Sequence, residues 1–151
     1  MIRDILSPEQ LAAATAAAEA VLHIDVDWSG TARKSRAIIA GLREALAADD
    51  LLHRISLFRI DCGEQQGQLW IAFGNWLEAQ SEDPLLRFHG NGGLIWMKGG
   101  TLTDTADYAA SFAVSELVCR TRAVFCEQSG GSTRQLEVSR SQQVKLQRVR
   151  L

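Results

Sequence analysis

Residues 21–33 read VLHIDVDWSGTAR, and within this stretch a strand pattern changes into a helix start. Apolar and polar side chains alternate over residues 21–28, which predicts a strand with its apolar residues on one face. The turn SGT at residues 29–31 interrupts that strand. An apolar stripe at helical spacing then predicts a helix over residues 32–48. A strand that leads directly into a helix is typical of an α/β protein.

Related patterns continue on both sides of this stretch. An edge strand is predicted over residues 1–6, and Ser7 with Pro8 starts a helix that the alanine-rich sequence extends to Ala20. The remaining predicted elements are a strand at 55–61, a helix at 68–80, a hairpin of strands at 94–97 and 101–105, and a helix at 107–125. This order predicts an α/β domain over residues 1–128, with a central mixed sheet flanked by helices on both faces.

The composition is that of an ordinary globular domain, with 46% hydrophobic and 23% charged residues among 151. No apolar run approaches the roughly 20 residues of a membrane span, and the N-terminal residues lack a signal-peptide core, so we expect a cytoplasmic protein. Three cysteines and three histidines are scattered without CxxC or metal-ligand spacing. We therefore expect no disulfide framework, no metal and no cofactor.

A basic C-terminal tail, residues 129–151, is the main charge feature. From residue 130 onward five basic residues and one acid give +4, which leaves −6 on the rest of a chain with net charge −2. Such a tail is either flexible or adds a strand to a sheet edge, and it suits contact with an acidic surface of a partner. Five cations without interleaved aromatic residues make nucleic acid an unfavoured partner.

The stretch at residues 21–33 also resembles a known family. It lies without gaps along the thioredoxin segment that ends in Trp-Cys-Gly-Pro-Cys-Lys. Trp28 and Gly30 match that segment, and Arg33 keeps its positive charge. The resemblance implies a thioredoxin-like fold.

Two further segments support the resemblance. Ile60-Asp61 is similar to the Ile-Asp or Val-Asp that closes the following thioredoxin strand. Residues 94–100, LIWMKGG, resemble the apolar strand and Lys-Asn-Gly-type turn of the family's hairpin. The resemblance covers roughly residues 1–126.

Four departures from the thioredoxin pattern bear on function. Ser29 and Ala32 occupy the positions of the two redox cysteines, and thiol–disulfide exchange needs a thiolate and a second sulfur. His23 stands where the family has a buried carboxylate, and Gly92 where it has a cis-proline. Standard oxidoreductase activity is therefore not expected.

A scaffold without its chemistry predicts a binding module. We expect a redox-inactive, thioredoxin-like protein-binding domain that acts as an adaptor, an assembly factor or a chaperone-like subunit. The resemblance implies a partner-binding groove formed by Trp28, Ser29, Gly30, Thr31, Ala32 and Gly92. An exposed tryptophan beside a groove suits a binding anchor, whereas simple packing of Trp28 is the alternative.

The helix start at residues 29–31 has two interpretations. Free amides with the nearby Arg33 and Lys34 suit an anion. The alternative is that Ser29 or Thr31 caps the helix and the basic residues face solvent.

An enzymatic alternative rests on other side chains. Cys62 at the end of a strand is a candidate reactive thiol for a redox sensor or enzyme, although buried packing is the commoner fate of cysteine. Asp25 and Asp27, two apart on one strand, are a candidate acid–base pair. The competing interpretation is that these carboxylates are solvated or paired with Arg33 or Lys34.

Overall fold

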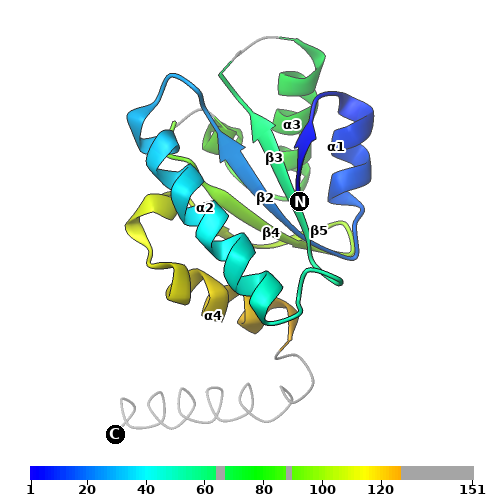
Figure 1. Cartoon of the computed structure of the whole chain (residues 1–151). Coiled ribbons are helices and arrows are strands. Elements are labelled where there is room, and N and C mark those ends of the chain that lie inside the picture. Colours follow the sequence, from blue (N-terminus) through cyan, green and yellow to red (C-terminus); the bar gives the residue numbers. More distant parts are fainter. Residues whose placement is uncertain (64–66, 88–89, 127–151) are drawn as a thin grey trace, which may run out of the picture.

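The computed structural model describes residues 1–63, 67–87 and 90–126. These residues form a five-stranded sheet in the order β1-β3-β2-β4-β5 (Figure 1). Its strands are β1 Ile2–Ile5, β2 Glu19–Asp25, β3 Ser56–Asp61, β4 Leu94–Lys98 and β5 Thr101–Ala106. The helices are α1 Pro8–Thr15, α2 Gly30–Ala48, α3 Gln68–Ala79 and α4 Val114–Phe125, with short 3₁₀ turns at Pro84–Arg87 and Ala109–Ser111.

The sheet is mixed, as the order of the elements predicts. β1, β3 and β2 run parallel, whereas β4 is antiparallel to both β2 and β5. β1 is an edge strand, which confirms the prediction for the first residues. The sequence-based prediction of an α/β fold with a central mixed sheet is correct.

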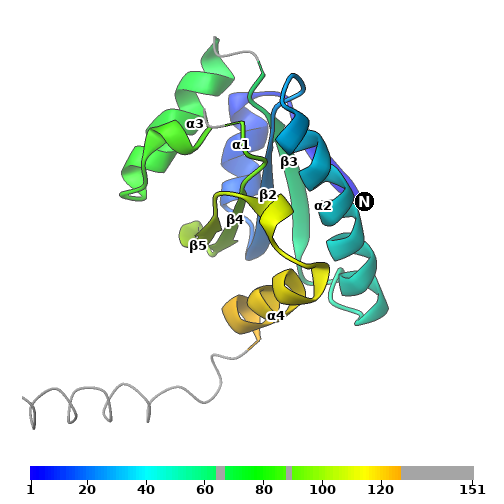
Figure 2. The ribbon, with the colours of Figure 1, turned by 90° about the vertical axis from the view of Figure 1, so that its left-hand side faces the viewer.

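Two hydrophobic cores lie on opposite faces of the sheet. Figure 2 shows α1 and α3 on one side and α2 and α4 on the other. Strand β2 serves both cores, because Leu22 and Ile24 pack toward α1 and α3 while Val21 packs toward α2 and α4. Trp96 is fully buried in the second core, where its indole N–H donates to Thr121 Oγ1 at 3.0 Å.

Helix α1 begins as predicted but ends five residues early. Ser7 Oγ accepts the Gln10 N–H, and Gln10 Oε1 accepts the Leu6 N–H in return. The helix ends at Thr15 because Glu19 already pairs with Lys98 in the sheet. Sheet pairing therefore overrides the helical propensity of the alanine-rich sequence up to Ala20.

Two other predicted boundaries are wrong. The strand predicted over residues 21–28 spans Glu19–Asp25, so Trp28 lies beyond it in the turn before α2. The last helix was predicted from residue 107 but begins at Val114, after a 3₁₀ turn. Glu116 Oε2 accepts the Ala113 N–H at 2.7 Å and so caps this later start.

Side chains cover the outer edge of the sheet at β5. Gln80 Oε1 accepts the Leu102 N–H at 2.8 Å. At Thr105, Asp104 Oδ1 accepts the backbone N–H at 2.9 Å and Arg120 Nη2 donates to the carbonyl at 2.7 Å. These contacts occupy backbone groups that an added strand would need.

The predicted boundary at residue 128 and the predicted tail, residues 129–151, lie outside the described residues. Within the part of the chain that the structure describes, no helix is both long enough and apolar enough to cross a bilayer.

Candidate functional site

The candidate site lies where β2 ends and α2 begins. Ser29 is the N-cap of α2, with its Oγ accepting the Ala32 N–H at 3.3 Å. The positions of the two redox cysteines in the resembled family therefore fall on the first turn of this helix. Of the two interpretations of residues 29–31, the structure supports helix capping by Ser29.

The Ser29 hydroxyl also connects this helix start to a distant loop. It donates to the Gly90 carbonyl at 2.5 Å, across 61 residues of sequence. Its proton is directed at a carbonyl oxygen, not at a base that could remove it, and a serine nucleophile needs such a base. Ser29 therefore serves as a tether between α2 and the segment that precedes β4.

His23 lies beneath the first turn of α2, in the place where the resembled family has a buried carboxylate. His23 is 2% exposed, and its Nε2 lies 2.9 Å from Ser35 Oγ, while Ser35 Oγ donates to the Ala32 carbonyl at 2.6 Å. A hydroxyl has one proton, so Nε2 must donate to Ser35 and the imidazole carries its hydrogen on Nε2. Burial lowers the pKa of His23 from 6.5 to about 4, with Arg59 and Arg36 adding to the effect against an opposing contribution from Asp25.

Gly92 packs directly on this hydrogen-bonded chain. It is buried with a φ of +66°, and a Cβ at this position would overlap Ser35 Oγ and lie 3.1 Å from Ala32 Cα. No peptide bond among the described residues is cis. Both Gly92 and Ala32 are buried, so neither offers exposed surface to a partner, and the predicted partner-binding groove stays a prediction.

Trp28, a member of the predicted groove, is 57% exposed. A Cβ at Gly90 would come within 2.9 Å of the indole Cη2, so the ring lies against the backbone of Gly90. Gly93 belongs to the same loop and packs beside Asp107: a Cβ built at Gly93 would lie 3.6 Å from Asp107 Cα. The residue after Asp107 is Tyr108, which is 43% exposed.

Asp25 and Asp27 do not share a site. Asp25 is fully buried, with Oδ2 accepting from Arg36 Nε at 2.7 Å and from Arg59 Nη1 at 3.2 Å, and Oδ1 accepting the Val26 N–H at 2.8 Å. Asp27 is exposed. The buried carboxylate is thus neutralised by two guanidinium groups, which leaves it poorly suited to acid–base chemistry.

The predicted cationic partners of these carboxylates are also wrong. Arg33 and Lys34 are both exposed, and the ion pair comes instead from Arg36, one turn further along α2. The second partner, Arg59, interrupts the apolar pattern of β3. The charge of Arg59 within the apolar sequence of β3 was the signal in the sequence that pointed to a buried ion pair with Asp25.

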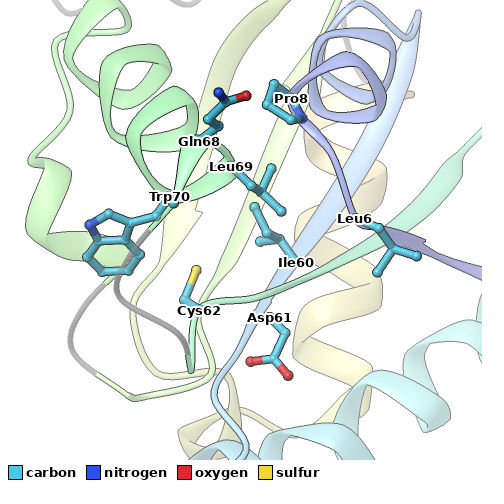
Figure 3. A pocket seen from close by; sticks show the side chains of 9 residues that line it. Leu6, Pro8, Ile60, Asp61, Cys62, Gln68, Leu69 and Trp70 are labelled. Carbon is cyan, nitrogen blue, oxygen red and sulfur yellow. The ribbon is translucent and has the colours of Figure 1, made fainter.

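Cys62 lies in the wall of a cavity of about 330 Å³ between the end of β3 and the start of α3 (Figure 3). It is 3% exposed, and burial raises the pKa of its thiol to about 12, with Asp61 adding to the rise. A thiol in this environment stays protonated at neutral pH. Burial and the raised pKa favour the interpretation of Cys62 as a packing residue, and a reactive Cys62 stays a prediction.

Cys119 and Cys126 form no disulfide; Cys119 is exposed and Cys126 is partly buried. Within residues 1–63, 67–87 and 90–126, no three His, Cys, Asp or Glu side chains come together in a way that could hold a metal ion.

Replacement of Gly92 tests the close packing on α2. We expect Gly92→Ala to lower the free energy of unfolding by at least about 1 kcal/mol more than Gly99→Ala, measured by urea unfolding. Both glycines have positive φ, but a Cβ at Gly99 meets nothing within 4 Å. Equal losses in the two variants would show that backbone strain alone matters at Gly92.

The low pKa of His23 makes stability depend on pH. The unfolded chain binds a proton near pH 6.5 and the folded chain only near pH 4, so stability from this residue is complete above pH 6.5 and falls as the pH drops toward 4. We expect the native chain to lose about 2 kcal/mol more than His23→Gln between neutral pH and about pH 5. The His53→Gln variant, which changes an exposed histidine, serves as control. If the free energy of unfolding of His23→Gln fell with pH as steeply as that of the native chain, His23 would not be the cause of the pH dependence.

Comparison with known proteins gives matches of structure alone. No protein-family model matches the chain, and no curated protein matches it. A thioredoxin from Malassezia sympodialis superposes with a TM-score of 0.57 at 16% identity, covering 82% of this chain and 90% of that one. Thioredoxin O2 from Arabidopsis thaliana in its oxidised state gives 0.55 at 16% identity, covering 82% and 94%.

A third solved structure, human ERp44 in a zinc-bound form, gives a TM-score of 0.56 at 14% identity. The match covers 81% of this chain and 31% of that one. Identities this low establish shared architecture and carry no activity across. The strand order, the helix layers and these superpositions agree: the chain has a thioredoxin-like fold.

Proposed function

We propose that this chain is a redox-inactive, thioredoxin-like protein-binding module that acts as an adaptor, an assembly factor or a chaperone-like subunit. The binding surface would centre on Trp28 and include the neighbouring Ser29, Gly30 and Thr31. The single observation that carries the proposal is the exposure of Trp28 on a rigid support.

An exposed indole is usually costly, because a large apolar surface remains in water. Here the ring lies against Gly90, and the adjacent Ser29 is hydrogen-bonded to the same residue. A side chain held in place in the free protein loses little conformational freedom on binding. Tryptophan is also among the residues that contribute most at protein interfaces.

The surroundings of Trp28 extend the surface. Gly90 and Gly93 belong to one loop, in which Gly90 lies against Trp28 and Gly93 lies beside Asp107. Tyr108, next to Asp107, is a second exposed aromatic side chain. A partner segment with apolar side chains, lying across this loop, would cover both aromatic residues.

The chemistry of the first turn supports binding over catalysis. Ser29 and Ala32 supply no sulfur, and Cys62 is a buried thiol with a raised pKa. Thiol–disulfide exchange requires an accessible thiolate. The imidazole of His23 is buried and hydrogen-bonded to Ser35. Contact of the tail, residues 129–151, with an acidic surface stays a prediction.

Affinity purification from the native host, read by mass spectrometry, tests the role of Trp28. We expect the intact chain to retain a specific protein partner that the Trp28→Ala variant loses, because the indole supplies the central apolar contact. Ile71→Ala is the matched control, since Ile71 on α3 has the same 57% exposure.

Retention of the same partner by Trp28→Ala and the intact chain would contradict the proposed surface. Loss of the partner with both Trp28→Ala and Ile71→Ala would also contradict it, because any exposed apolar residue would then suffice. Thermal unfolding of each variant confirms that the fold is kept.

A further inference from the structure

A second cavity lies on the other face of the sheet from Cys62, between α2 and the strands β1, β3 and β2. Its volume is about 280 Å³, and it is lined by Ile2, Asp4, His23, Arg36, Ile39 and Arg59. The proposed binding surface at Trp28 contains none of these residues. The cavity is therefore a separate feature of the molecule.

Strand register explains why these residues meet. Asp4 pairs with Arg59 across β1 and β3, and His23 pairs with Arg59 across β2 and β3, so the three form a row across the parallel strands. Side chains of one such row point to the same face of the sheet. Arg36 and Ile39 reach the row from α2 above it.

Both arginines are held in place through buried Asp25. Arg36 uses Nε to donate to Asp25 Oδ2, while Arg59 uses Nη1 for the same oxygen and Nε for Asp4 Oδ1. Among the described residues, these bonds leave both Nη groups of Arg36 and Nη2 of Arg59 without a protein acceptor. The side chains of Arg36 and Arg59 are 39% and 37% exposed, and both line the cavity.

Free guanidinium N–H groups fixed in direction favour an anion with planar oxygens. The charges of Asp4, Asp25, Arg36 and Arg59 cancel and His23 is neutral, so no net charge attracts a multiply charged anion. Asp4 repels such an anion more strongly than it repels a monocarboxylate. The other walls, Ile2 and Ile39, are apolar. A cavity of about 280 Å³ has room for a small organic anion.

We propose that this cavity binds a small monocarboxylate, with its carboxylate on the free N–H groups of Arg36 and Arg59 and its apolar part against Ile2 and Ile39. The competing explanation is a purely structural ion-pair network that attaches β1 to the sheet. The proposal predicts that a carboxylate binds in a saturable manner, whereas a purely structural network predicts no such binding.

Titration of the full chain with isobutyrate, followed by two-dimensional NMR of backbone and arginine N–H groups, separates them. We expect saturable shifts at the residues that line the cavity. Isobutanol, which has the apolar part without the charge, and inorganic phosphate are the comparison ligands, and both should bind at least about tenfold more weakly. Absence of saturable shifts with isobutyrate, or equal binding of phosphate, would overturn the proposal.

Variants locate the binding. Arg36→Gln should weaken isobutyrate binding by about tenfold or more, whereas Arg33→Gln, the same charge change on an exposed position of α2, should not. Ile2→Phe fills the cavity while it keeps every charge, and should also abolish binding, so the test does not depend on the stability of Arg36→Gln. Native affinity in Ile2→Phe would overturn the proposal.

Discussion

The structure depends on the burial of one carboxylate. Asp25 is fully buried at the end of the central strand β2, and an unpaired charge there would cost several kcal/mol. Arg36 from α2 and Arg59 from β3 neutralise it, and Arg59 in turn binds Asp4 on β1. One buried charge thereby connects a helix and three parallel strands, and it sets the position of α2 on the sheet.

The position of α2 determines what its first turn can do. With the helix fixed, Ser35 lies between His23 below and Gly92 beside it, and Ser29 reaches Gly90. Close approach of the loop requires glycine, because any Cβ at Gly92 would overlap the helix. The result is a first turn closed by hydrogen bonds and packing, with Trp28 left exposed beside it.

At the start of α2, hydrogen bonds hold this thioredoxin-like fold together where the resembled family has cysteines. The groups that supply a thiolate and tune it are replaced by groups that hydrogen-bond to one another: Ser29 with Gly90, and His23 with Ser35. The first bond holds the loop to the start of α2, and the second holds β2 to α2. The scaffold therefore keeps its rigidity and its exposed aromatic residue, which are properties that a binding surface needs.

Much of the fold could be predicted from the sequence, because periodicity and turn residues are local signals. The strand–helix unit around residues 21–48, the parallel β3 and the hairpin of β4 and β5 all carry such signals. The end of α1 could not be predicted, since the alanine-rich sequence favours a helix and only the pairing of Glu19 with Lys98 overrides it. The start of α4 was missed because the 3₁₀ turn before it contains no glycine or proline.

The candidate site was predicted less completely, because it depends on contacts between distant residues. The sequence identified Trp28, Ser29 and Gly92 through alignment with a known pattern, but not that Gly92 is buried against Ser35. For Asp25 the sequence suggested solvation or a pair with Arg33 or Lys34, which are closer in sequence than Arg36 and Arg59. Only the strand register and the helix face reveal which cations reach the buried carboxylate.

The most direct test of the claim that thiol–disulfide chemistry has been lost is an insulin-disulfide reduction assay with dithiothreitol as electron donor. The native chain, a Cys62→Ser variant and a redox-active thioredoxin would be compared at equal concentration. We expect the native chain and the variant to give the rate of dithiothreitol alone. A faster rate with the native chain that disappears in Cys62→Ser would show that the buried thiol reacts, and would contradict a purely binding role.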